Sequence, residues 1–249
     1  MYETINIRGV NIRNVTMNEA MDYTREVLTS ERTSPAVIYT PNAEIAQLCI
    51  DNPEIAQLIN SADFIIPDGA GVVLASKILG KPLKEKVAGV TLSEKAIGQL
   101  NEIGGRLYLL GGKPGVAETA KANLAVKYPN CTVCGVRDGY FKPEDEPEII
   151  AQINAAAPDA VFVCLGAPRQ EKWIARHRGE ISAKLMMGLG GSIDIWAGTA
   201  KMVPDIFLKL NLEWFYRLCK QPSRLGRMMK LPKYVFGCMF YRIRHGKGA

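Results

Sequence analysis

Residues 160–178, AVFVCLGAPRQEKWIARHR, decide the fold. They begin with six apolar residues in a row, which is the length of a strand rather than a helix. A Gly-Ala-Pro turn follows, and polar and apolar residues then recur at helical spacing up to Arg178. A strand that is apolar on both faces is typical of a parallel sheet covered by helices on both sides. The segment therefore predicts a strand, a turn and a helix, one unit of an α/β fold.

The same pattern recurs outward from this segment along most of the chain. Five further apolar runs predict strands at residues 36–39, 64–66, 107–110, 132–136 and 184–189. Helical patterns separate most of these runs, and Asn52-Pro53, a cap residue before a proline, splits one of them in two. The sequence therefore predicts an α/β fold with a Rossmann-like parallel sheet flanked by helices, which ends near residue 195.

Local signals mark three other elements. Residues 5–15 alternate in polarity around an Arg-Gly pair and predict a β-hairpin. Thr16 and Glu19 have the spacing of a capping box, in which a hydroxyl and a carboxylate satisfy the first free N–H groups of a helix. Thr91 and Glu94 repeat that spacing, so we expect helices to begin at both places.

Composition limits the class of protein. The chain has 249 residues, of which 47% are hydrophobic and 22% are charged. These values are typical of soluble globular proteins and exclude collagen-like, wholly disordered and polytopic membrane classes. No stretch approaches the roughly 20 apolar residues of a membrane-spanning helix. The first 15 residues alternate in polarity, so we expect no secretory signal.

Charge divides the chain into two parts. Residues 201–249 hold eleven Lys and Arg but two acidic residues, a net charge of +9 that leaves −3 for the first 200. Their helical patterns, interrupted at Pro222 and Pro232, place Phe, Tyr and Met beside the basic residues. Such a segment either packs on the core or lies in the headgroup region of a membrane, and we favour the membrane. We predict a catalytic core at residues 1–195 and, at 196–249, a basic amphipathic helical appendage that targets the membrane and completes the active site.

Cysteines and histidines offer little chemistry. Six scattered cysteines are too few for a disulfide scaffold in a chain of this length, which favours a reducing cytoplasm. Cys131 and Cys134 fall in a strand pattern that places them on opposite faces, and no second pair completes a zinc site. We expect His177 and His245 to be exposed and without partners for a metal site or a catalytic triad.

Polar or glycine-rich sequence follows nearly every predicted strand. In a parallel sheet, ligands bind outside the carboxyl ends of the strands, so these segments predict one shared site. They are Thr40-Pro-Asn42, Pro67-Asp-Gly-Ala-Gly71, Gly111-Gly-Lys-Pro-Gly115, Gly166-Ala-Pro-Arg-Gln-Glu171 and Gly190-Gly-Ser192. Glycines and helix starts suit a phosphate group, but each glycine pair also suits a simple turn. The spacings of P-loop ATPases and of dinucleotide-binding sites are absent.

Asp68 is the sharpest catalytic candidate. A carboxylate beside Gly69 and Gly71 can take a proton from an attacking hydroxyl, although an Asp-Gly pair is also a common turn. Thr40 and Asn42 follow the neighbouring strand and either orient a sugar or cap the next helix.

Five of these segments, in order, resemble the WecG/TagA/CpsF glycosyltransferases over nearly the whole chain. The matching motifs are Thr40-Pro-Asn-Ala-Glu44, Ile66-Pro-Asp-Gly-Ala-Gly-Val72, Leu110-Gly-Gly112, Leu165-Gly-Ala-Pro-Arg-Gln-Glu-Lys-Trp173 and Gly188-Leu-Gly-Gly191. The basic, aromatic tail is similar to that of the branch acting in wall teichoic acid synthesis. The resemblance implies an inverting transfer of N-acetylmannosamine from UDP-ManNAc to the 4-hydroxyl of GlcNAc-diphospho-undecaprenol, at the cytoplasmic face of the cell membrane.

The resemblance also implies roles for individual residues. Asp68 would be the catalytic base, with Thr40 near the reacting sugar. The expected substrate-binding residues are Asn42, Gly69, Gly71, Gly111, Gly112, Arg169, Gln170, Gly190, Arg217, Arg224 and Arg227. Arginine can grip a diphosphate with two parallel hydrogen bonds, and no pair of acids stands beside the glycine segments. We therefore expect a reaction with no metal ion or other cofactor.

Three alternatives stay open. A relative that uses UDP-N-acetylmannosaminuronic acid or UDP-glucose would share these motifs. A non-catalytic nucleotide-binding module with a nucleic-acid-binding tail would share the charge, but the tail's aromatics cluster in helical runs, which disfavours a nucleic-acid partner. The apolar part of the tail could also pair two copies of the chain into a homo-oligomer.

Overall fold

The computed structural model describes residues 2–32, 34–204, 206–207, 213–220, 226 and 229–246. Two sheets are formed by the strands β1 (Thr4–Ile7), β2 (Val10–Arg13), β3 (Ala36–Tyr39), β4 (Phe64–Ile65), β5 (Arg106–Gly111), β6 (Thr132–Arg137), β7 (Ala160–Cys164) and β8 (Leu185–Gly188). The helices of the core are α1 (Met17–Thr29), α2 (Ala43–Asp51), α3 (Pro53–Asn60), α4 (Ala70–Ile78), α5 (Gly89–Ile103), α6 (Val116–Lys127), the 3-10 turn η1 (Pro143–Asp145), α7 (Glu146–Ala156), α8 (Arg169–His177) and α9 (Ser192–Trp196). The C-terminal segment adds α11 (Glu213–Lys220) and α13 (Lys230–His245).

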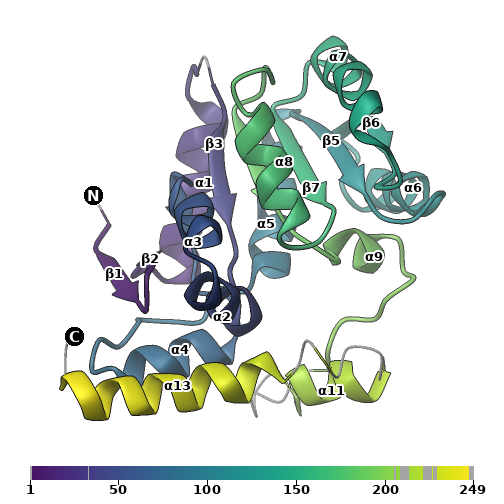
Figure 1. Ribbon diagram of the computed structural model, residues 1–249. Helices are drawn as coiled ribbons and strands as arrows, with labels where there is room; N and C mark the ends of the chain where they lie inside the picture. The colour runs from purple at the N-terminus through teal and green to yellow at the C-terminus, as the bar shows by residue number, and fades with distance from the viewer. Residues whose placement is uncertain are drawn as a thin grey trace.

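The central sheet has six strands in the order β4-β3-β8-β7-β5-β6, and every pair in it is parallel. Helices cover both faces (Figure 1). One face packs on α1, α5, α6 and α9, and the other on α2, α3, α4, α7, α8 and α13. The predicted α/β class, the parallel sheet and its strands are confirmed. Because all six strands run the same way, their carboxyl ends lie along one edge of the sheet.

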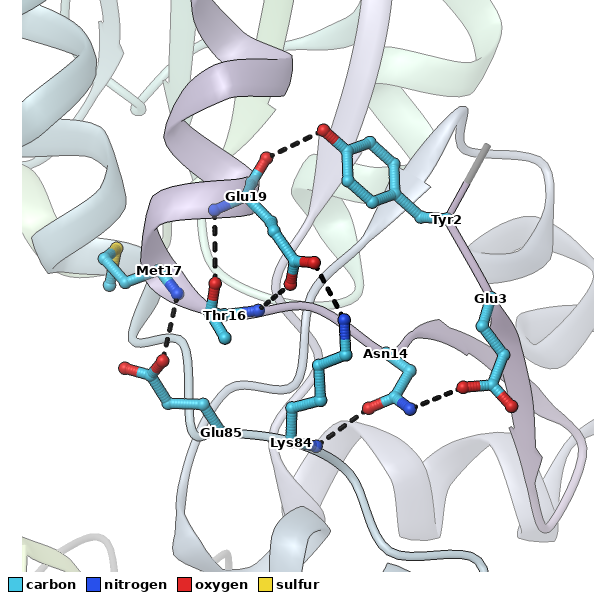
Figure 2. Close-up of polar contacts among 8 residues, drawn as sticks. All are labelled: Tyr2, Glu3, Asn14, Thr16, Met17, Glu19, Lys84 and Glu85. Carbon is cyan, nitrogen blue, oxygen red and sulfur yellow. Dashed lines mark hydrogen bonds and ion pairs between the residues drawn. The ribbon is translucent and has the colours of Figure 1, made fainter.

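The predicted hairpin and capping box are present at the N-terminus. Strands β1 and β2 pair antiparallel. The Thr16 hydroxyl accepts from Glu19 N at 3.3 Å, and Glu19 Oε2 accepts from Thr16 N at 2.7 Å (Figure 2). The same view shows the loop between α4 and α5 tied to the start of α1, with Lys84 Nζ 2.8 Å from Glu19 Oε1 and Glu85 accepting from Met17 N.

The helix expected to begin at Thr91 begins two residues earlier, at Gly89. No side chain caps this helix, and Glu94 pairs with Lys127 instead. A Cβ atom at Gly89 would lie 2.9 Å from the Thr40 side chain. The start of α5 is therefore set by the close approach of a glycine to the end of β3, which local spacing does not reveal.

Helix α13 packs on the core of its own chain. Tyr234 and Cys238 are fully buried, and Arg8 from the hairpin donates to the Gly237 carbonyl at 2.9 Å. Pro232 was expected to interrupt the helix but lies in its first turn, where proline's missing N–H has no helical acceptor to lose. Among the described residues, no helix is long and apolar enough to cross a membrane. The division at residue 195 stays a prediction.

The expected exposure of His177 is wrong. The residue is 7% exposed, with Nε2 2.7 Å from Glu146 Oε2 and Nδ1 2.8 Å from Glu180 Oε1. Its hydrogen-bond partners come from α7 and from the chain after α8, and Trp173 of α8 packs against its ring, so its basic neighbours in sequence misled the prediction. The two cysteines of the CxxC pair do contact opposite faces of the sheet, as predicted.

Candidate active site

The predicted site residues do gather at the carboxyl edge of the sheet. Thr40 follows β3, Asp68 follows β4, and Gly190 follows β8, which lies between β3 and β7. Gly111 ends β5, and Arg169 begins α8 after β7. Segments more than 100 residues apart in sequence thus meet at one edge, as the strand-end argument predicts.

A cavity of about 730 Å³ opens at the ends of β5, β6 and β7. Its wall contains the cations Lys113, Lys142 and Arg169 and the carboxylates Glu146 and Asp194. Cys164 also lines it, but burial raises the pKa of this thiol to about 12, so it stays protonated at neutral pH. The volume lies within the roughly 300–1,000 Å³ of small-molecule sites, and three cations in one wall suit an anionic ligand.

Gly111 and Gly112 allow two strands to approach closely beside this cavity. A Cβ atom at Gly111 would lie 2.3 Å from the Cys164 carbonyl oxygen, and Gly112 N donates to that oxygen at 3.3 Å. Gly112 has a φ of +78°, which favours glycine. The Gly112 carbonyl accepts from Gly139 N at 2.8 Å. These contacts explain both glycines structurally; ligand binding by them stays a prediction, and Gly112 alone of the two lines the cavity.

Arg169 holds the loop that follows β6. Its guanidinium donates to the carbonyls of Gly139 at 2.7 Å and Phe141 at 3.2 Å, and lies 4.7 Å from the centre of the Phe141 ring. A guanidinium has five N–H groups, so these two bonds leave donors for a ligand in the cavity that it lines. Arg169 is therefore placed both to shape the cavity wall and to meet an anion.

Gln170 was expected in the donor pocket, but it is 3% exposed. Its Oε1 accepts from Gly166 N at 3.2 Å and Gly190 N at 2.9 Å, and its Nε2 donates to Glu171 Oε1 at 2.9 Å. The side chain therefore joins the loops after β7 and β8, and its contact with the donor stays a prediction. Gly190 meets Gln170 through its backbone and has a φ of +53°.

Thr40 lies where β3, β8 and α5 meet. Its hydroxyl donates to the Gly188 carbonyl at 3.3 Å. Asn42, two residues on, caps α2, because its Oδ1 accepts from Glu44 N at 3.0 Å and Ile45 N at 3.1 Å. The capping alternative is thus confirmed for Asn42, whereas contact with a sugar stays a prediction.

Asp68 is half-buried at the turn from β4 into α4. Its N–H donates to the Ile66 carbonyl at 3.0 Å, and Gly69 follows with a φ of +83°. A Cβ atom at Gly71 would lie 2.6 Å from Leu231 of α13 and 2.8 Å from Ala43, so Gly71 admits α13. The turn therefore carries Asp68 at the sheet edge, and the helix that follows it, α4, packs against the C-terminal helix. The roles of Asp68 and these glycines toward substrate stay predictions.

Sequence reasoning missed Lys86 at this end of the edge. Val87 N donates to the Pro67 carbonyl at 3.0 Å, which fixes Lys86 close to the Asp68 turn. Lys86 forms an ion pair with Glu213 of α11 and so links the C-terminal segment to the core. No motif marks a lone lysine in a loop, so only these contacts identify Lys86 as a link between α11 and the core.

The remaining predicted residues belong to the C-terminal segment. Arg224 and Arg227, and the side chain of Arg217, lie outside the described residues. Within the described part of the chain, no three His, Cys, Asp or Glu side chains come together as metal ligands would. The expectation of a metal-free reaction stays a prediction.

Comparison with known proteins agrees with the motifs. Residues 5–248 match the profile of the Glycosyl transferase WecG/TagA/CpsF family. A Bacillus subtilis protein named N-acetylglucosaminyldiphosphoundecaprenol N-acetyl-beta-D-mannosaminyltransferase is 36% identical over 94% of this chain and 90% of its own length. Proteins of the same name from Bacillus spizizenii and Staphylococcus aureus are 40% and 34% identical over 80% and 93% of this chain, and 77% and 91% of their own lengths. The chain therefore belongs to the WecG/TagA/CpsF family and is a glycosyltransferase.

Proposed function

We propose that this enzyme transfers N-acetylmannosamine from UDP-ManNAc to GlcNAc-diphospho-undecaprenol, with inversion, and forms the β-1,4 linkage disaccharide of wall teichoic acid. The observation that carries the proposal is that relatives 34–40% identical, matched over most of their length, bear the name of an N-acetylmannosaminyltransferase acting on that lipid-linked acceptor. The donor sugar, the linkage and the pathway come from the family resemblance.

The cavity at β5, β6 and β7 suits the UDP part of the donor. Lys113, Lys142 and Arg169 bring positive charge to its wall, where a diphosphate needs neutralisation. Asp194 adds a carboxylate that can accept hydrogen bonds from ribose hydroxyls. This arrangement leaves the sugar to extend along the edge toward Thr40 and Asp68.

In the proposed reaction, a hydroxyl oxygen of the acceptor attacks the anomeric carbon of the donor as the bond from that carbon to the UDP oxygen breaks. Asp68 takes the proton of the attacking hydroxyl, and UDP leaves with the electron pair of the broken bond. Thr40 orients the reacting sugar. Arginines relieve the charge on the departing diphosphate, which is a role that we assign to Arg169 and, in the tail, to Arg217, Arg224 and Arg227. No metal ion takes part in this scheme.

The C-terminal segment supports a peripheral position on the cytoplasmic face of the membrane. The outer side of α13 exposes Phe236, Phe240 and Ile243, while the exposed Arg244 supplies positive charge. Large apolar side chains beside basic ones suit an anionic headgroup region. Since α13 also approaches Gly71, in the first turn of the helix that follows Asp68, we propose that docking on the membrane and completion of the active site are coupled.

Release of UDP tests the function. The wild-type enzyme is given UDP-ManNAc and lipid-linked GlcNAc diphosphate in EDTA, beside Asp68→Asn, which keeps the shape of the side chain but cannot take the proton. We expect acceptor-dependent turnover by the wild type and a loss of about 10²- to 10⁴-fold in kcat for Asp68→Asn, the range of general base catalysis.

Asp22→Asn is the matched control, since Asp22 is exposed on α1 and should keep full activity. Turnover by Asp68→Asn equal to the control would remove Asp68 as the base. Turnover with UDP-glucose or UDP-N-acetylmannosaminuronic acid, but none with UDP-ManNAc, would keep the mechanism and change the donor. Inactivity with all three, together with salt-sensitive RNA binding, would favour the non-catalytic alternative.

A further inference from the structure

Gln170 forms a bridge beneath the active-site edge. Its Oε1 accepts from two backbone N–H groups, those of Gly166 after β7 and Gly190 after β8. A backbone N–H can only donate, so the side-chain oxygen, and not the nitrogen, must face both glycines. The bridge therefore works in one of the two orientations of the amide.

The other end of this amide points into the protein. A Cβ atom at Gly188, the last residue of β8, would lie 3.1 Å from Gln170 Nε2, so the glycine makes room for the amide under the strand. In such a buried place Nε2 needs an acceptor, because an unpaired buried donor is costly. Glu171 Oε1 supplies that acceptor at 2.9 Å.

Glu171 is itself an unusual residue to bury. It is 2% exposed, its Oε2 has no hydrogen-bond partner among the described residues, and burial raises the pKa of its carboxyl. It lines no part of the cavity. The Tyr39 hydroxyl donates to its main-chain carbonyl at 3.1 Å, which holds the start of α8 against β3. The side-chain hydrogen bond of its carboxyl is the one with Gln170.

Gln170 joins two loops of the active-site edge, the one after β7 and the one after β8. The loop after β7 leads from Leu165, in the cavity wall, to Arg169, which grips the loop after β6. The strand before Gly190 ends at Gly188, whose carbonyl accepts from the Thr40 hydroxyl. The Gln170 bridge therefore joins the loop that borders the cavity to the strand whose last residue contacts Thr40.

We propose that Glu171 is a positioning residue for glycosyl transfer: its carboxyl oxygen fixes the orientation of the Gln170 amide, which joins the β7 and β8 loops and sets the cavity wall relative to Thr40. Its effect on catalysis rests on the proposed function, whereas its effect on the two loops does not.

Two substitutions separate this role from bulk packing. Glu171→Gln keeps an oxygen that can accept from Gln170 Nε2, and Glu171→Met has a similar length but no such acceptor. In the UDP-release assay we expect Glu171→Gln to keep at least half of the wild-type kcat/KM and Glu171→Met to lose tenfold or more. Gln170→Met should lose as much, and the double variant no more than Gln170→Met alone, because both act through one bridge.

Hydrogen exchange measured by NMR tests whether the Gln170 hydrogen bonds are intact, and it needs no turnover. The amide protons of Gly166 and Gly190 should exchange at least tenfold faster in Glu171→Met than in the wild type, and at the wild-type rate in Glu171→Gln. This result holds even when no donor sugar is turned over, so failure of the proposed function and failure of the bridge are distinguishable.

Unchanged exchange at both glycines in a folded Glu171→Met would overturn the proposal. So would a folded Glu171→Gln that loses tenfold in kcat/KM, because a charge rather than an acceptor would then be required. Additive losses in the double variant would also contradict it. If Glu171→Met does not fold, Glu171→Leu, which also lacks an acceptor, takes its place in each of these measurements.

Discussion

Helices α8 and α13 reverse the usual distribution of side chains, in opposite ways. Helix α8 buries the polar residues Gln170, Glu171 and His177. Helix α13 leaves apolar residues in solvent, with Phe236 58%, Phe240 71% and Ile243 80% exposed. Both arrangements cost free energy unless something compensates, since buried polar groups need partners and exposed apolar groups favour leaving water.

The compensation differs between the two helices. On α8 it comes from within the chain, where Gln170 and His177 are matched by backbone amides and carboxylates. On α13 the inner side packs through Tyr234 and Cys238, but nothing in the chain's described part covers Phe240 or Ile243. Figure 1 shows α13 along the outer surface beside α4. We therefore expect α8 to hold the site together and α13 to meet the membrane, as proposed above.

The largest expected effect concerns α13. Replacing Phe236, Phe240 and Ile243 together with serine should weaken binding to phosphatidylglycerol vesicles about 100-fold, from roughly 1 kcal/mol of apolar burial for each side chain. Cosedimentation with vesicles measures this. The control is Ile103→Ser with Val126→Ser, which removes exposed apolar residues from α5 and α6. Equal vesicle binding by both variants would break the comparison and remove α13 as the membrane surface.

An effect of intermediate size is expected at the start of α8. Arg169→Lys keeps the charge but loses the two bonds to the Gly139 and Phe141 carbonyls, worth about 1 kcal/mol each. We expect KM for the UDP-sugar to rise about tenfold or more. Lys172→Arg, an exposed change on the same helix, should leave KM unaltered. If Arg169→Lys also leaves KM unaltered, substrate binding does not depend on the two hydrogen bonds from Arg169 to the loop after β6.

The smallest effect is a dependence of stability on pH. Burial raises the pKa of Glu171 in the folded state, so between the unfolded and folded pKa values the folded protein holds a proton that the unfolded chain has released. Stability from this group is therefore lost as pH rises above about 4.3, the unfolded value. The Tm of Glu171→Gln should therefore rise relative to the Tm of the wild type as pH increases from 4 to 8. The expected change is about 2–4 °C for each kcal/mol of stability that the wild type loses. A constant difference in Tm would mean that Glu171 does not titrate in this window.

Individual residues show which parts of the site the sequence pattern could predict. The strand ends were predicted to form the site because parallel strands place their carboxyl ends together, and Thr40, Asp68 and Arg169 do lie there. Gln170 was expected to face the ligand, and its three hydrogen bonds to Gly166, Gly190 and Glu171 were not predicted. Lys86 was not singled out, since its ion pair with Glu213 joins residues 127 positions apart.

The order of strands and helices, the division of charge and the family can be read from the chain as written, because apolar periodicity, capping residues and motif order are local properties. The partners of Gln170, the burial of His177 and the start of α5 at Gly89 cannot, because each depends on segments that meet only when the sheet is assembled. Hydrogen-bond satisfaction and steric fit are set by distances between such segments, and spacing along the chain does not encode them directly.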